Sequence, residues 1–344
     1  MTGTTLDEAY ERVRHSGPER NGWLSNHAPM AVEALVRHGH ERAVHRWLDA
    51  YADRLDERPR GIRPIPTDEW RDPLGDPLRT GDWLSYFERE LADEPWREVL
   101  VRWWPRLLPG IAAGATHGVI RVGHAVRALL DEESGPRVDE LGQGLAYWAA
   151  RWQPLAPPGV GPYPATDPRS ALDAVPRVPD QRFGIRARLA QLADSPDWPA
   201  ASGAVPGEVA DGVPARLAAV VDAAVARHGT HGYASPVMLV HAATAPNAVL
   251  RTLPALPSRL WAPSLDAAWA AAAAVTAAYA PAEARPAPPA RPTLVAEEVM
   301  RQAAASGDPH AIKFADAAID TYDRGGDPGI LATAAQSTGQ IAAD

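Results

Sequence analysis

Hydrophobic residues recur roughly every three to four positions along most of the chain, the spacing that places side chains on one face of an α-helix. Strict alternation of apolar and polar residues, the pattern of a half-buried β-strand, is scarce. The sequence therefore predicts an all-α protein. The predicted helices span residues 5–15, 27–39, 40–56, 80–92, 95–107, 110–131, 138–153, 184–194, 207–228, 235–253, 264–280, 293–306 and 309–324.

Two segments interrupt the helical pattern, residues 57–78 and 154–183, and both are rich in Pro, Gly and Asp. Long ordered loops of this kind often cover a functional site. Residues 281–292, PAEARPAPPARP, have the composition of an extended polyproline connector. Because the chain has no internal repeat and no sharp shift in composition, we expect one multi-helix domain over residues 1–325. A small polar tail is expected over residues 326–344.

Composition excludes several classes of protein and of site. Of the 344 residues, 46% are hydrophobic and 22% are charged, which argues against a disordered chain. The net charge is −9 and no basic block stands alone, so we expect no nucleic-acid partner. The sequence has no cysteine, which excludes disulfides, thiolate metal sites and cysteine nucleophiles. A metal ion in this protein therefore needs imidazole and oxygen ligands.

The N-terminal segment lacks the regions of a secretion signal, and the Ala-rich stretch 267–280 is too short and weakly apolar to span a bilayer. We therefore expect a cytoplasmic protein without a membrane partner. The glycine-rich run PPGVGPYP, residues 157–164, is full of proline and follows no predicted strand, so it does not fit a dinucleotide-binding loop. The sequence does not predict an oligomeric state.

Histidines interrupt four of the apolar segments, where a polar side chain needs a partner. These segments are WLSNHAPMAVEAL with His27, GATHGVIRVGHAVRALL with His117 and His124, PVMLVHAATAPNAVL with His241, and DPHAIKFADA with His310. Spacings of four and seven residues place His117, Arg121 and His124 on one helical face. Taken singly, His27 and His241 also fit a different role, as capping or hydrogen-bonded core histidines.

Lys313 is the only lysine in the chain; the other 33 of the 34 basic residues are arginine. Asp308 and Pro309 predict a helix start, so His310 and Lys313 share a face within its first turns. The positive field of a helix start disfavours an ammonium group there. A neutral lysine amine can react with carbon dioxide to form a carbamate, an anionic metal ligand that arginine cannot provide. Chance survival of one lysine in an arginine-biased chain is the alternative.

Together, four separate apolar helices each offer an imidazole, and one offers a carboxylate-like group. That ligand composition suits iron, zinc, manganese or nickel. It predicts a metal site at the centre of the helix bundle.

The motifs LSNHAPMAVEAL, THGVIRVGHAVRAL, LVHAATAPNAVLRTL and HAIKFADA also resemble, in order and rough spacing, the questin oxidase-like family. The resemblance covers about residues 20–325. It implies an oxygenase related to one that opens the central ring of an anthraquinone in polyketide biosynthesis, a reaction described as Baeyer–Villiger-like and NADPH-dependent. It also implies a non-haem iron centre with histidine ligands and a modified lysine.

Carried over by position, the resemblance implies the metal ligands His27, His117, His241, His310 and Lys313. It implies that Arg121 and His124 line the same cavity without binding the metal, and that Lys313 takes part in catalysis. Some relatives carry a second histidine where this chain has Arg121, and Asn247 stands where a larger or more basic residue is expected. These departures bear on the substrate rather than on the ligand set.

Three functions remain open from the sequence. The first is an Fe(II)-dependent oxygenase, or one with another first-row metal, that oxidises and ring-cleaves a phenolic, anthraquinone-like substrate with dioxygen. The second is an NADPH-dependent Baeyer–Villiger-type monooxygenase without bound metal, and a metal hydrolase is a variant. Few Asp or Glu residues are expected near the histidines, which disfavours a two-metal site. The third is a non-catalytic helical scaffold. In the first function, candidates for walls against a flat substrate are Trp23, Trp83, Trp103, Trp104 and Trp148, although packing in the core is the more usual role of any one of them.

Overall fold

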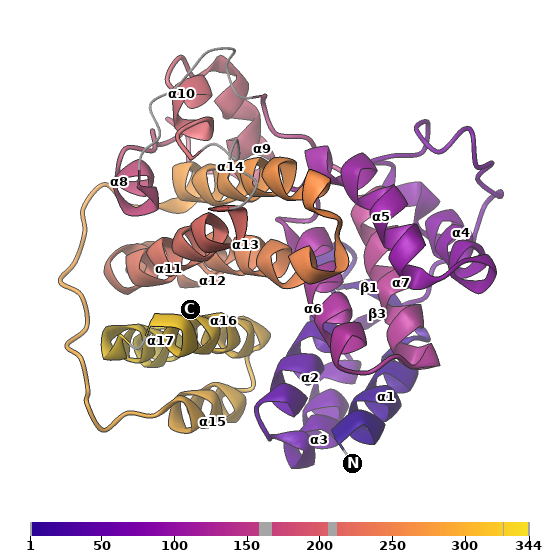
Figure 1. The fold of residues 1–344 in the computed structure, drawn as a ribbon, viewed down its shortest axis with the longest axis horizontal. Coiled ribbons are helices and arrows are strands. Elements are labelled where there is room, and N and C mark those ends of the chain that lie inside the picture. The colour runs from indigo at the N-terminus through magenta and orange to yellow at the C-terminus, as the bar shows by residue number, and fades with distance from the viewer. Residues whose placement is uncertain (1, 158–166, 206–211, 326, 343–344) are drawn as a thin grey trace. The chain divides into compact units, whose positions relative to one another are not determined.

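The protein is all-α, as the hydrophobic pattern predicts (Figure 1). The structure is a computed structural model that describes residues 2–157, 167–205, 212–325 and 327–342. Its backbone contacts divide the chain into two compact units. Unit 1 consists of Met1–Pro154 and Arg251–Pro257, and unit 2 consists of Leu155–Leu250 and Ser258–Asp344. One domain over residues 1–325 stays a prediction.

Unit 1 is built around α6, which packs against α2 and α7, while α4 packs on the other side of α7. Its helices are α1 (Thr2–Val13), α2 (Ala28–Arg37), α3 (Glu41–Ala52), α4 (Thr80–Asp93), α5 (Trp96–Leu107), α6 (His117–Asp131) and α7 (Gly135–Ala150). A small antiparallel sheet, which the sequence did not predict, has the order β2-β1-β3. Its strands are β1 (Ser16–Arg20), β2 (Leu24–Ser25) and β3 (Leu55–Glu57).

Tryptophans form much of the core of unit 1. Trp83 and Trp103 meet edge to face at a centroid distance of 5.5 Å, and Trp104 and Trp148 do so at 5.4 Å. All four side chains are fully buried, whereas Trp23 is 67% exposed. Edge-to-face aromatic pairs add to the stabilisation that burial alone gives. These four tryptophans therefore pack in the core of unit 1, the role that is more usual for any one of them.

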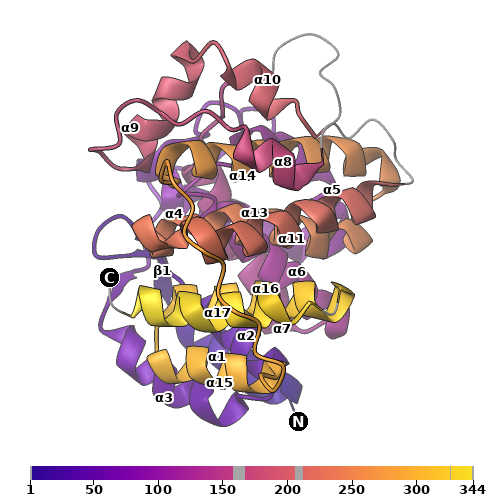
Figure 2. The same ribbon diagram turned by 90° about the vertical axis from the view of Figure 1, so that its left-hand side faces the viewer.

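Unit 2 is a stack of helical layers: α14, then α11 with α13, then α16 with α17, and finally α15 (Figures 1 and 2). Its longer helices are α11 (Val213–His231), α13 (His241–Thr252), α14 (Trp261–Tyr279), α15 (Ala296–Ser306), α16 (Pro309–Gly325) and α17 (Pro328–Ile341). Its short helices are α8 (Pro168–Asp173), α9 (Ile185–Ala190), α10 (Trp198–Ser202) and α12 (Pro236–Leu239). Short 3₁₀ turns occur in both units. In unit 1 they lie at Pro77–Arg79, Leu108–Gly110 and Leu253–Ala255, and in unit 2 at Gln191–Asp194, Gly232–Ala234 and Ser258–Leu260.

The predicted helices are present, with differences at their ends. The helix expected over 235–253 is two helices, α12 and α13, and the helix expected over 110–131 begins only at His117. Where a polar tail was expected, Pro328–Ile341 form α17, which packs against α16. Its few large apolar residues are spaced among Ala, Thr and Gly, so its helical period is weak in the sequence. Residues 158–164 of the glycine-rich run and 207–211 of a predicted helix lie outside the described residues.

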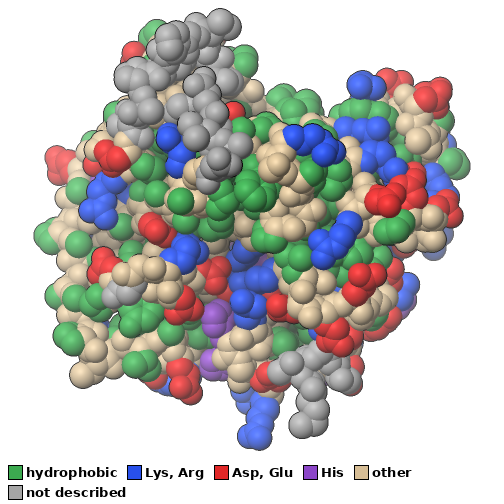
Figure 3. All heavy atoms as spheres, in the orientation of Figure 1, with side chains coloured by type: hydrophobic (Ala, Val, Ile, Leu, Met, Phe, Trp, Pro, Cys, Tyr) green, Lys and Arg blue, Asp and Glu red, His purple; other side chains and the backbone are tan. Residues whose placement is uncertain are grey.

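Among the described residues, no helix is both long and apolar enough to cross a membrane. The space-filling view of Figure 3 shows Asp and Glu side chains interspersed with Arg side chains. This mixed surface agrees with the absence of a basic block in the sequence.

Candidate metal centre

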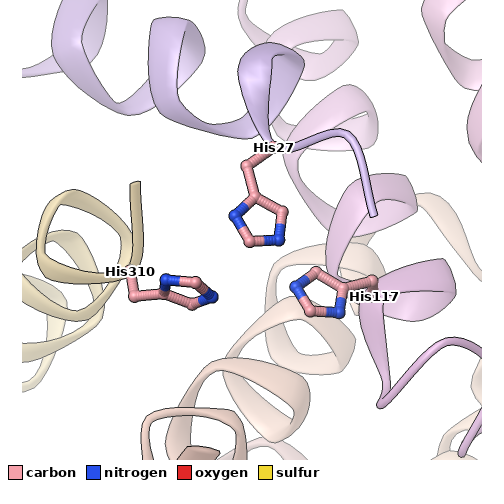
Figure 4. Close-up of side chains that lie close together, drawn as sticks. All are labelled: His27, His117 and His310. Carbon is pink, nitrogen blue, oxygen red and sulfur yellow. The ribbon is translucent and has the colours of Figure 1, made fainter. Parts of the chain in front are cut away.

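Two buried histidines of unit 1 lie side by side at helix starts. His27 immediately precedes α2, where Asn26 Oδ1 accepts a hydrogen bond from the backbone N–H of Ala28 at 2.9 Å. His117 is the first residue of α6. The two rings stack at a centroid distance of 4.5 Å, and a nitrogen of one lies within 4.8 Å of a nitrogen of the other (Figure 4). Both side chains are directed so that one ion can be bound by the pair.

A left-handed turn sets the orientation of His117. Gly114, Ala115 and Thr116 have φ values of 54°, 57° and 69°. Such values are uncommon for residues other than glycine, and least favourable for a β-branched residue such as Thr116. The turn brings the Gly114 carbonyl within 2.6 Å of His117 Nδ1, which must therefore donate the hydrogen bond. In the neutral ring, the lone pair is then on Nε2.

Replacing Gly114 by alanine is expected to destabilise the protein by about 1–3 kcal/mol, because the change adds strain at a positive φ. The new Cβ would also lie 2.5 Å from the hydroxyl oxygen of Tyr147, which is hydrogen-bonded to Ser25 at 2.6 Å. Denaturant unfolding measures the effect. The control is Gly339→Ala in α17, where a Cβ meets no atom within 4 Å and a gain of about 0.5–1 kcal/mol is expected. Equal stability of Gly114→Ala and wild type would contradict this account of the turn.

Further along α6, Arg121 and His124 are held by buried carboxylates. Arg121 donates from Nε to Glu140 Oε1 at 2.6 Å and from Nη2 to Glu140 Oε2 at 2.8 Å. His124 Nδ1 lies 2.6 Å from Glu33 Oε2, and Arg127 bonds both oxygens of Glu33. Each of these five side chains is at most 8% exposed.

The charges of this network are set by competition between burial and pairing. Burial alone would raise the pKa of Glu33, but the Arg127 charge and the His124 hydrogen bond lower it. Burial lowers the pKa of His124, although Glu33 opposes this shift. Burial raises the pKa of Glu140 despite its pairing with Arg121. Arg127 bonds both oxygens of Glu33, and Glu33 and His124 are also grouped closely enough to bind a metal ion. The predicted substrate-facing roles of Arg121 and His124 stay predictions.

Unit 2 holds a second pair of buried histidines together with the lone lysine. His241, the first residue of α13, and His310, in the first turn of α16, meet edge to face at a centroid distance of 5.7 Å. Figure 4 shows the His310 side chain projecting from the start of α16. Lys313 follows one turn later and is 1% exposed. Burial, followed by the charges of Lys313 and His310, lowers the pKa of His241 well below its usual value.

The predicted helix start at Asp308 is present. Asp308 Oδ1 accepts a hydrogen bond from the backbone N–H of His310 at 2.7 Å, and the same oxygen lies 3.1 Å from His310 Nδ1. His241 Nδ1 lies 3.0 Å from the carbonyl oxygen of Met238. Because these oxygens are acceptors, Nδ1 is the donor in both histidines.

The histidines of each unit have the hydrogen-bond pattern of ligands to a first-row metal. His117, His241 and His310 each give the Nδ1 proton to a carbonyl or carboxylate oxygen, which places the lone pair on Nε2. Histidines that bind metals almost always have such a second hydrogen bond, because it fixes the tautomer and the direction of the ring. His241, whose pKa burial lowers well below its usual value, is neutral at pH 7, as a metal ligand must be.

Sequence reasoning missed the carboxylates that accompany these side chains. Glu33 and Glu140 contact two of the candidate residues directly, and Asp316, one turn after Lys313 on α16, is fully buried. The expectation of few carboxylates near the histidines was therefore wrong. A usable signal was present, since Glu33 interrupts the apolar run MAVEALV of α2, where an unpaired charge is very costly.

Comparison with known proteins bears on the first part of the chain. No curated protein matches the sequence. The sequence model of the family described as Questin oxidase-like matches residues 24–132. That segment contains His27, His117, Arg121 and His124, and the remaining candidate residues lie beyond it. The match over residues 24–132 supports the resemblance to the Questin oxidase-like family.

Proposed function

We propose that the protein is a metal-dependent oxygenase that uses non-haem iron and dioxygen to oxidise a phenolic, anthraquinone-like substrate. The observation that carries the proposal is the shared tautomer of His117, His241 and His310, each of which presents Nε2 as its ligand atom. The family match supports oxidoreductase chemistry on this class of substrate. The proposed ligands are His27, His117, His241, His310 and Lys313.

Each group of side chains has its own role in the proposed site. The imidazoles bind the ion through neutral nitrogens, and a bound ferrous ion would supply the site that activates dioxygen. Asp308 and the carbonyls of Gly114 and Met238 hold the rings in their binding orientation. Near-complete burial of His241 and Lys313 keeps bulk water away from this group.

Lys313 is proposed to act as a carbamate. A buried ammonium beside two imidazoles and a metal ion would be strongly disfavoured. Reaction of the amine with carbon dioxide releases one proton and gives an anionic oxygen ligand. The positive end of α16, which begins at Pro309, favours an anion at this position.

Replacement of Lys313 by arginine is expected to lower turnover at least about tenfold, because guanidinium cannot form the carbamate ligand. Circular dichroism should report an unchanged helix content, and elemental analysis a lower metal content. Lys313→Glu, which restores a carboxylate, serves as the matched variant and is expected to recover part of the metal binding. Normal metal content and turnover in Lys313→Arg would indicate that Lys313 has no role in the site and is present by chance.

The proposed function is tested by metal analysis of protein purified without a histidine tag, followed by dioxygen uptake with 1,8-dihydroxyanthraquinone. One iron per chain with substrate-dependent uptake is expected. Tight NADPH binding and turnover without metal would favour the Baeyer–Villiger-type alternative. If the protein neither bound metal nor consumed dioxygen, the non-catalytic helical scaffold would be the remaining hypothesis.

A further inference from the structure

A pocket in unit 2 lies apart from all the residues assigned so far. It has a volume of about 400 Å³ and is bordered by α8, α11, α17 and the connector that follows α14. This size is within the range of small-molecule sites, roughly 300–1,000 Å³. Its apolar walls come from Leu172, Ala223, Ala226, Pro288 and Ile330.

Hydrogen bonds join the connector to the end of α11 and to Tyr233, beside the pocket. Figure 2 shows this segment, after Tyr279, crossing in front of α11 and α17. The backbone N–H of Arg285 donates to the carbonyl of Thr230 at 2.8 Å, and the Tyr233 hydroxyl donates to the carbonyl of Glu283 at 2.9 Å. The Arg285 guanidinium also lies over the Tyr233 ring.

His231, at the end of α11, gives the pocket one well-defined polar atom. The Thr230 hydroxyl donates to the carbonyl of Arg227 at 3.0 Å, so its oxygen must accept from His231 Nδ1 at 2.7 Å. The lone pair of the neutral ring is therefore on Nε2, for which the described part of the chain provides no hydrogen-bond partner. His231 is only 9% exposed and lines the pocket, and burial together with the Arg227 charge lowers its pKa.

The charged groups around the pocket are largely matched among themselves. Arg227 forms an ion pair with Asp173, and Asp327 Oδ1 accepts the backbone N–H of Gly329 at 2.8 Å. Arg169 also lines the pocket, so two arginines and two carboxylates border it and their formal charges cancel. An uncharged ligand with a hydroxyl group instead finds an acceptor in His231 and apolar walls for its body.

We propose that this pocket binds a neutral hydroxylated ring compound, with its O–H donated to His231 Nε2 and its ring against Leu172, Ala226 and Ile330. The site contains none of the residues proposed to bind metal. It therefore assigns unit 2 a small-molecule site of its own, whose binding does not depend on the metal.

The test is calorimetric titration of the full-length protein with 2-naphthol and with 2-methoxynaphthalene, which has the same ring but no donor. The hydroxyl compound is expected to bind roughly three- to tenfold more tightly, the effect of one hydrogen bond. This preference should vanish in His231→Phe. In Ala226→Phe, which fills the pocket, 2-naphthol should bind at least about tenfold more weakly. The matched control is Ala219→Phe on the same helix, at a partly exposed position that does not line the pocket.

Failure of wild type to bind 2-naphthol, equal affinity for the two probes, or unchanged binding in Ala226→Phe would each overturn the inference. If circular dichroism shows that His231→Phe does not fold, the affinities of Ala226→Phe and Ala219→Phe for 2-naphthol still test whether the ligand occupies this pocket. Metal content is measured on the same samples. Metal without 2-naphthol binding refutes this site alone, whereas selective binding without metal refutes only the proposed oxygenase.

Discussion

His241→Ala is expected to lower metal affinity at least about 100-fold, because loss of a ligand exceeds the 10- to 100-fold cost of losing a ligand's hydrogen-bond partner. His117→Ala is expected to lose metal to the same extent, since both side chains are proposed to bind one ion. Metal content is measured by elemental analysis after dialysis against a weak chelator.

The control for these two variants is His45→Ala. His45 is a surface histidine, with its side chain 42% exposed and hydrogen-bonded to Glu8. Its loss should leave the metal content unchanged. If His117→Ala or His241→Ala retained a full metal complement, the proposed ligand set would be wrong. If each variant lost only part of its metal, the hypothesis that His117 and His241 bind the same ion would also be contradicted.

Glu33→Gln is expected to destabilise the protein by about 3–5 kcal/mol, the usual effect of breaking a buried ion pair from one side. The change leaves the Arg127 charge buried without its partner carboxylate, and one remaining oxygen must serve both Arg127 and His124. Denaturant unfolding monitored by circular dichroism gives the free energy of unfolding. The matched control is Glu298→Gln, which breaks the exposed pair with Arg301 and should leave the stability almost unchanged.

The same residue predicts a dependence of stability on pH. The pKa of Glu33 is lower in the folded protein, about 2, than its ordinary value of 4.5. Its contribution is therefore fully present above about pH 4.5 and is lost as the pH falls towards 2. Between these values wild type should lose stability more steeply than Glu33→Gln. Parallel curves for the two proteins would show that the carboxylate is not paired as described.

Much of the fold follows from local patterns. The start of α16 was predictable because Asp308 and Pro309 are strong helix-start residues and act over one turn. The left-handed turn before His117 was not, because Ala115 and Thr116 have no intrinsic preference for it and tertiary contacts impose it. The small sheet was missed since β2 has only two residues.

The candidate site was predictable in part for a related reason. A histidine within an apolar segment marks a buried polar group, so the imidazoles were found without knowledge of their neighbours. Their hydrogen-bond acceptors were not found, because Glu33 and His124 are 91 residues apart in the sequence. For the tryptophans, composition alone could not decide between a role in the core and a role in a substrate cavity. Trp83 and Trp103 were plausible substrate walls from composition, and only the packing around them identifies them as core.

The left-handed turn at residues 114–116 also bears on the order in which the protein folds. Tyr147 and Ser25, whose hydroxyls meet beside Gly114, come from segments separated by 122 residues. Contacts between such distant segments form late, because the intervening chain must first be ordered. We therefore expect His117 to reach its orientation only after α7 and β2 have docked, and we expect the proposed metal ion to bind to the folded chain. Iron added during refolding should leave the refolding rate unchanged, and the yield of loaded protein should be set by the metal supplied afterwards.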